Sequence, residues 1–113
     1  MTEDVFTALA DPTRRTILDL LATHGHGTAT TLAAELPVSR VAVIKHLAVL
    51  DRAGLVAAQR HGREVRYVVV PRPLAETAAW MARLAADPPL REQVREGFVA
   101  NGMVAAAGWQ DLP

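Results

Sequence analysis

The sequence predicts a mainly α-helical fold with one small β-hairpin, and three observations support this prediction. Apolar residues recur at helical spacing in five segments of the first 86 residues. Asp, Thr or Ser stands just before three of these segments, as expected of helix N-caps. Two runs rich in β-branched residues, 55–60 and 64–70, flank His61-Gly62-Arg63 and predict an antiparallel hairpin.

The first two helices are predicted on either side of Asp11-Pro12. Before it, one face of a short helix carries the apolar residues Val5, Phe6, Leu9 and Ala10. Asp is a favoured N-cap and Pro is favoured at the first helical position, so a second helix begins at this dipeptide. Its apolar side consists of Ile17, Leu18, Leu20 and Leu21, and the helix ends at residues 24–27.

The third and fourth helices are predicted from their caps. Thr28 caps the third helix, which turns Leu32, Ala33 and Leu36 inward and stops at Pro37. Ser39 caps the fourth, in which Val43, Leu47 and Leu50 recur at helical spacing and should face the core. Gly54 is the expected left-handed residue at its end.

A fifth helix follows the hairpin. Pro71 and Pro73 are expected to end the second strand. A helical stripe is then formed by Leu74, Ala78, Met81 and Ala85. The order of four helices, hairpin and helix predicts a winged helix-turn-helix domain over residues 1–86. Residues 87–113 form a C-terminal extension of uncertain structure, in which Leu90, Val94 and Phe98 suggest a further helix.

Charge is distributed unevenly along this 113-residue chain, although the formal net charge is zero. Residues 38–72 carry seven Lys or Arg and two acidic residues, a net charge of +5. The segments 1–37 and 73–113 have net charges of −3 and −2. The positive charge therefore coincides with the fourth helix and the hairpin, which favours contact with nucleic acid.

Several classes of protein do not fit the composition. The absence of cysteine excludes disulfides and thiolate metal sites. No apolar run is long enough for a membrane span, and no signal sequence is apparent, so we expect a soluble, cytoplasmic protein without membrane contact. Ser39 and Thr13 have no base placed beside them and suit helix starts, so an enzyme is not expected.

The fourth helix has the size of a major-groove reader, and a charged ribbon beside it reaches the phosphates or the minor groove. Val41, Ile44 and Ala48 form a second apolar stripe, roughly opposite the core stripe. One interpretation is contact with thymine methyl groups, favouring A·T-containing sites. The alternative is packing of this face on a partner protein.

The segment 9–18, LADPTRRTIL, resembles the opening of the ArsR family of bacterial winged helix-turn-helix regulators. The resemblance continues through Val38-Ser39-Arg40, residues 45–47, 53–56 and 62–67, and covers roughly residues 4–86. It implies a homodimer paired through the first and last helices, bound to a palindromic double-stranded DNA operator and usually acting as a repressor. It often implies a small-molecule inducer, here of unknown identity.

The resemblance also implies roles for individual residues. The DNA-facing positions of the fourth helix are Ser39 at the cap, Arg40, Val41, Ile44 and Lys45. Val41 and Ile44 depart from the family, where polar residues are common. The dimer interface is expected to include Val5, Phe6 and Leu9 with Leu74, Ala78, Met81 and Ala85. The family's cysteine metal sites and its acid and histidine clusters on the last helix are absent, so we expect no metal and no cofactor.

Other polar residues carry alternatives that the sequence leaves open. His61 and Arg63 at the hairpin tip suit phosphate or minor-groove contact, and His46 either touches a phosphate or caps a surface. Arg60 and Arg66 are expected to face each other across the ribbon, which favours phosphate contact over pairing with Glu64.

Two further pairs have both structural and functional interpretations. One of Arg14 and Arg15 is expected to reach the DNA backbone and the other to pair with Asp11 or Asp19. His24 and His26 are expected to be exposed loop residues; the alternative is that they help to bind a metal ion across a dimer.

Two other functions compete with operator binding. One is a protein-interaction module that keeps the winged fold but binds DNA weakly. The other is a small-molecule sensor whose pocket lies between the last helix and residues 90–113, which is compatible with DNA binding.

Overall fold

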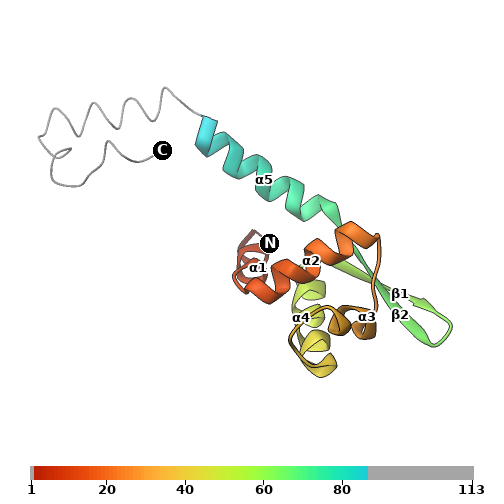
Figure 1. Ribbon diagram of the computed structural model, residues 1–113. Coiled ribbons are helices and arrows are strands. Elements are labelled where there is room, and N and C mark those ends of the chain that lie inside the picture. The colour runs from red at the N-terminus through yellow and green to blue at the C-terminus, as the bar shows by residue number, and fades with distance from the viewer. Residues whose placement is uncertain (1, 87–113) are drawn as a thin grey trace, which may run out of the picture. The chain divides into compact units, whose positions relative to one another are not determined.

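The structure is a computed structural model that describes residues 2–86, with side chains from residue 4. In this part of the chain the elements follow the predicted order (Figure 1). They are α1 (Thr2–Leu9), α2 (Pro12–His24), α3 (Ala29–Ala34), α4 (Arg40–Arg52), β1 (Val56–His61), β2 (Glu64–Val69) and α5 (Pro71–Ala86). The winged helix-turn-helix prediction is confirmed. The further helix suggested by Leu90, Val94 and Phe98 lies outside the described residues.

Side-chain caps fix the starts of three helices, as predicted. The Asp11 carboxylate accepts hydrogen bonds from the backbone N–H groups of Thr13 at 2.8 Å and Arg14 at 3.2 Å. Thr28 and Thr31 form a reciprocal capping box at the start of α3. The Ser39 hydroxyl accepts from the N–H of Ala42 at 3.1 Å. Each cap satisfies backbone donors that the first helical turn leaves unpaired.

The end of α4 is closed by a left-handed glycine, as predicted. Gly54 has φ +76°, a conformation that costs other L-residues steric energy. Its N–H donates to the carbonyl of Asp51, and the N–H of Leu55 donates to that of Leu50, both at 2.9 Å. This pair of bonds is a Schellman motif, which turns the chain from α4 directly into β1.

Helix α3 ends earlier than the sequence indicates. It stops at Ala34, whereas Pro37 was the predicted stop. The N–H of Glu35 donates to the carbonyl of Leu32, and that of Leu36 to Ala33, so the chain tightens into i to i−3 bonds before the proline.

The hairpin turn contains two residues rather than the predicted three. His61 belongs to β1 and pairs with Glu64, which leaves Gly62 and Arg63 as the turn. Gly62 has φ +63°, as the tight hairpin turns favoured by right-handed strand twist require. Strand β2 ends at Val69, shortly before Pro71, as predicted. Pro71 and Pro73 themselves lie in the first turn of α5, where a missing N–H costs no helical hydrogen bond.

The hairpin is tied to the helices through the loop between α2 and α3. Gly27 and Tyr67 form an isolated antiparallel bridge, with N···O distances of 3.1 and 2.8 Å. A Cβ built on Gly27 would lie 3.0 Å from a methyl group of Leu21, so a larger residue here would require the Leu21 side chain to shift. Beyond this bridge the strands extend away from the helices (Figure 1).

The core is aliphatic and draws on every element up to β1. Buried side chains come from α1, α2, α3, α4 and the start of β1, among them Val5, Ile17, Leu21, Leu32, Val43, Leu47, Leu50 and Leu55. The chain divides into two units between Ala78 and Ala79, within α5. No helix in residues 2–86 is long and apolar enough to cross a membrane.

Candidate nucleic-acid interface

Helix α4 has one buried face and one exposed face. Val43, Leu47 and Leu50 are 0% exposed, because they pack into the core as their spacing predicts. On the other side, Val41 is 61% and Ile44 41% exposed, and Ala48 is also exposed. The second apolar stripe is therefore on the surface, where its methyl groups are accessible to a ligand.

Cationic side chains flank this exposed stripe. Arg40 and Lys45 are exposed, and neither forms an ion pair within the described part of the chain. Nε of Arg40 donates to the hydroxyl of Thr30 on α3 at 3.2 Å. The Ser39 hydroxyl accepts at the helix start, which leaves its own O–H free to donate outward.

His46 is half-buried, and one of its ring nitrogens contacts α2. Its Nδ1 lies 3.3 Å from Nη1 of Arg14. A guanidinium only donates hydrogen bonds, so Nδ1 accepts, and the neutral ring then carries its proton on Nε2.

Arg14 and Arg15 both bind the C-terminal end of α1. Arg14 donates from Nε to the carbonyl of Ala8 at 2.7 Å and from Nη2 to that of Thr7 at 3.2 Å. Arg15 donates to the carbonyl of Leu9 at 2.6 Å. These carbonyls have no partner within the helix, and they carry the negative end of its dipole. Nη1 of Arg14 also lies 3.9 Å from a carboxylate oxygen of Asp11. This is the ion pair with Asp11 that was expected for one of the two arginines.

The electrostatic surroundings of Asp11 favour its ionised form. Desolvation raises the pKa of its carboxyl group, but the backbone hydrogen bonds from Arg14 and Thr13 lower it. Electrostatic interactions with His46 and Arg14 lower it further. The net result is a pKa of Asp11 below its ordinary value of 3.8, so the cap of α2 is ionised at neutral pH.

The wing, which is the hairpin formed by β1 and β2, carries exposed basic side chains near its tip. Arg60, His61 and Arg63 are exposed, and none of them forms an ion pair among the described residues. Their positions suit contact with a polyanion that approaches the hairpin, because no internal carboxylate competes for them.

Arg60 and Arg66 do not face each other, so that expectation is wrong. The two-residue turn pairs Arg60 with Val65 and Gln59 with Arg66, which places the two arginines on opposite faces of the ribbon. Arg66 instead pairs with Glu64, two residues away on the same face, at 3.2 Å. The alternative that the sequence ranked lower is therefore the observed contact.

A polar groove lies where α3, α4 and the wing meet. It has a volume of about 450 Å³. Its lining includes Thr28, Thr30, Thr31, Arg40, Ile44, Arg63, Glu64 and Tyr67. The threonines were not among the predicted site residues, since no local pattern distinguishes Thr30 from other residues near a helix start.

The predicted dimer residues occupy different environments. Val5 is 2% exposed and belongs to the core, and Leu9 packs partly against it. Phe6 is 39% exposed on the outside of α1. On α5, Leu74 is half-buried against the core, whereas Ala78, Met81 and Ala85 are exposed. The same helix exposes two further apolar side chains, Trp80 at 40% and Leu84 at 54%.

The two loop histidines do not assemble a metal site within residues 4–86. Nε2 of His24 lies 3.4 Å from a carboxylate oxygen of Glu35, and both side chains are about half exposed. His26 is an exposed neighbour. No group of three metal-ligating side chains is formed among the described residues.

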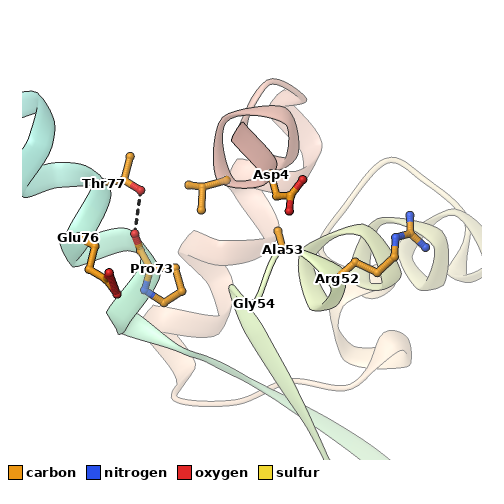
Figure 2. Close-up of a pocket in the computed structure, with 8 residues that line it drawn as sticks. Asp4, Arg52, Ala53, Gly54, Pro73, Glu76 and Thr77 are labelled. Atoms are coloured by element: carbon orange, nitrogen blue, oxygen red, sulfur yellow. Dashed lines mark hydrogen bonds between the residues drawn. The ribbon is translucent and has the colours of Figure 1, made fainter. Parts of the chain in front are cut away.

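Figure 2 shows residues that line a second cavity, which has a volume of about 330 Å³. Its lining comes from α1, from the end of α4 and from the start of α5, and comprises Asp4, Val5, Arg52, Ala53, Gly54, Pro73, Glu76 and Thr77. Thr77 is 4% exposed and donates its hydroxyl to the carbonyl of Pro73 at 2.8 Å. The cavity therefore adjoins both α1 and the end of α4.

Known proteins share both this sequence pattern and this geometry. The profile of a helix-turn-helix domain family matches residues 9–58. The transcriptional repressor SdpR of Bacillus subtilis is 36% identical over 78 residues, which are 69% of this chain and 86% of SdpR. An ArsR-like transcriptional regulator from Rhodococcus sp. RHA1 superimposes with a TM-score of 0.72 at 38% identity, covering 86% of this chain and 91% of the other.

The chain belongs to the ArsR family of transcriptional regulators. A second solved family member, the regulator RHA00566, is 30% identical, with a TM-score of 0.66 over 74% of this chain and 84% of its own. As an ArsR-family protein the chain is a DNA-binding regulator and not an enzyme. In helix-turn-helix folds the second helix of the motif, which is α4 in this chain, is the element that enters the major groove.

Proposed function

We propose that this ArsR-family protein is a homodimeric repressor that binds a palindromic operator through α4 and the wing. The observation that carries the proposal is the two-sided character of α4. Its core face is fully buried, while Val41 and Ile44 are 61% and 41% exposed beside the unpaired cations Arg40 and Lys45. An exposed apolar stripe bordered by cations fits a base-pair edge between two phosphate strands.

Repression and cellular location are inferred from the relatives. SdpR is named a transcriptional repressor, and it matches most of the present chain. A repressor of this kind acts on chromosomal DNA in the cytoplasm. Binding alone then accounts for its activity, because a protein seated on a promoter blocks transcription without further chemistry.

Dimerisation through α1 and α5 is supported by apolar side chains that these helices expose. Phe6 lies on α1, and Trp80, Met81 and Leu84 lie on α5. Burying such side chains in a second copy would stabilise a small domain whose own core is modest. Two copies related by a two-fold axis would present their recognition helices about 34 Å apart, one turn of DNA.

Base preference is assigned to Val41 and Ile44. Their side chains offer only methyl and methylene groups, which match the C5 methyl group of thymine in the major groove. We therefore propose operator half-sites that contain A·T pairs opposite the middle of α4. Lys45, His46 and the wing residues Arg60, His61 and Arg63 would contribute phosphate contacts. Arg66 is already paired with Glu64 and would contribute less.

Selection from a random duplex library at two salt concentrations tests the proposal. A palindromic consensus with half-sites about ten base pairs apart would support it. Sedimentation of the free protein tests the dimer directly, and a monomer at micromolar concentration would contradict that part. Salt-sensitive binding without any enriched sequence would contradict the operator.

The main rival is a protein-interaction module that uses the same exposed stripe. Replacing both Val41 and Ile44 with Asp separates the two functions, because both positions are on the surface and should tolerate the change in folding. Loss of operator binding in this variant supports the proposal. Unchanged DNA binding with loss of a protein partner would support the rival.

A small-molecule inducer is part of the proposal, and the cavity in Figure 2 supports it. Its volume of about 330 Å³ lies within the usual range of ligand sites, and its occupant would touch α1, α4 and α5 together. Replacing Ala53 with Leu would fill it. A compound library screened by thermal unfolding should then contain molecules that raise the Tm of the wild type and not that of A53L. Compounds that stabilise wild type and A53L equally would contradict this site.

We also propose that residues 1–86 are sufficient for DNA binding and that residues 87–113 are an extension. A chain truncated after Ala86 should bind the selected operator with unchanged sequence preference. Loss of dimerisation or of operator binding on truncation would contradict this division.

A further inference from the structure

Arg40 differs from Lys45 and Arg63 in having a side-chain hydrogen bond to another residue of the described chain. Its Nε donates to the hydroxyl of Thr30 at 3.2 Å, so the guanidinium is held toward α3. By contrast, Lys45 and Arg63 have no hydrogen bond or ion pair from their side chains within the described chain. The Thr30 contact uses one of five N–H donors and leaves the two terminal nitrogens available.

The Arg40 side chain lines the polar groove where α3, α4 and the wing meet. Arg40 and Ile44 line it from α4, and Arg63 and Val65 line it from the hairpin. Glu64 also lines the groove, but its carboxylate is already paired with Arg66 at 3.2 Å. The two unpaired charges in the groove are therefore both positive.

We propose that this groove binds one phosphodiester group of the operator, held by Arg40 from the recognition helix and Arg63 from the wing. Thr30 is a positioning residue that aims the Arg40 guanidinium at the phosphate. The inference rests on the proposed operator binding and makes it more specific. It assigns Arg40 to the DNA backbone, although an arginine on α4 could also recognise a base, and leaves base preference to Val41 and Ile44.

The physical reason is geometric and electrostatic. A planar guanidinium suits a phosphate, because two parallel N–H groups match two of its oxygens. Two arginines from different elements can only meet the same phosphate if α4 and the hairpin keep a fixed spacing. The Gly27–Tyr67 bridge supplies that fixed spacing, because it joins β2 to the loop ahead of α3.

The first experiment maps the phosphates on the selected operator with the full chain. Neutral methylphosphonate replaces each phosphate of one half-site in turn, and Kd is measured for wild type, R40A and R63A. Replacement at one position should weaken wild type most, and the same replacement should have a smaller effect on both R40A and R63A, because each variant keeps only one of the two arginines. Different positions for the two arginines would overturn the shared site.

The second experiment separates backbone contact from base readout. R40A should weaken all duplexes alike and lower the slope of log affinity against log salt by about one unit. A changed preference at one base pair, with the slope unaltered, would overturn the assignment and make Arg40 a base reader. If the wild type selects no sequence at all, the proposed operator binding fails before this question arises.

The third experiment tests Thr30 with variants of matched size. T30V removes the hydroxyl and T30S keeps it, at an exposed position where both should fold. T30V should weaken operator binding about fivefold, as expected for the loss of one hydrogen bond, while T30S stays near wild type. In an R40A background T30V should have no effect. Equal affinities of T30V and wild type would overturn the positioning role.

Discussion

Nη1 of Arg14 lies 3.3 Å from Nδ1 of His46, so a side chain of α2 contacts the recognition helix. The same guanidinium donates to the carbonyls of Thr7 and Ala8 at the end of α1. One arginine thus joins the helix proposed for dimerisation to the helix proposed for DNA recognition. If α1 moved, Arg14 would have to move with it, and its contact with His46 on α4 would change.

Arg14 is expected to stabilise the fold more than its neighbour does. Its side chain is 15% exposed and makes three hydrogen bonds, whereas exposed Arg15 makes one. Arg14→Lys should lower the free energy of unfolding by about 1–3 kcal/mol, because a lysine cannot reach all three acceptors. The control Arg15→Lys should stay within about 0.5 kcal/mol. Urea unfolding of both measures this, and equal losses would contradict the assignment.

Acid should remove the stabilisation that Asp11 supplies. The pKa of Asp11 in the folded protein lies below its ordinary value of 3.8, so on acidification the unfolded chain takes up the proton first. The stabilisation is fully present above that value and is lost as pH falls through the lower folded-state pKa. Asp11→Asn retains an N-cap but cannot titrate. Its free energy of unfolding should therefore fall less than that of wild type between pH 5 and pH 2, a range chosen to span the ordinary Asp value. Parallel pH curves would contradict the prediction.

Gly54 should tolerate asparagine better than alanine. Its φ of +76° belongs to the left-handed region, and a Cβ would meet only Pro73 at 3.8 Å, so strain rather than collision decides the outcome. Gly54→Ala should lower the free energy of unfolding by about 1–2 kcal/mol, and Gly54→Asn by less. Thermal unfolding compares the two, and a larger loss for Asn than for Ala would show that space is limiting.

Arg63 should contribute to the salt dependence of DNA binding. It is exposed at the hairpin turn and forms no ion pair with any residue from 4 to 86, so replacing it with Ala should lower the salt slope by about one unit. Arg72→Ala is a control of equal charge change, at a residue whose Nε lies 3.6 Å from Glu76 on α5. Fluorescence anisotropy over a salt series gives both slopes. The same slope for R63A and wild type would remove the wing tip from the interface.

Thymine recognition by Val41 and Ile44 can be tested with a single methyl group. Uracil in place of thymine in the operator leaves every hydrogen-bonding group unchanged. Burial of one methyl group contributes about 0.8 kcal/mol, so each contacted thymine should cost about fourfold in affinity when replaced. The V41A/I44A variant should bind both duplexes alike. If the double variant still discriminates thymine from uracil, another side chain makes the contact.

Much of the fold follows from local chemistry and was therefore predictable. Caps at Asp11, Thr28 and Ser39 begin three helices, and Gly54 closes the fourth, because these residues satisfy or turn the backbone wherever they stand. The spacing of Val43, Leu47 and Leu50 identified the buried face of α4, since only one face of a surface helix can enter the core. The exposed stripe with Val41 and Ile44 follows from the same periodicity.

Other features depend on contacts between segments that are distant in the chain. The register of the hairpin depends on a turn of two residues instead of three, and this difference places Arg60 and Arg66 on opposite faces of the ribbon. Arg66 then pairs with Glu64, its neighbour on the same face of β2. The bonds from Arg14 to His46 and from Arg40 to Thr30 join residues 32 and 10 positions apart. The residues next to a side chain in the sequence determine its backbone conformation and the face of the helix or strand on which it lies. Its interaction partner depends instead on which elements pack together. The sequence therefore determined the elements and the charged surface, and the tertiary structure decided which arginines support the fold and which remain free for a ligand.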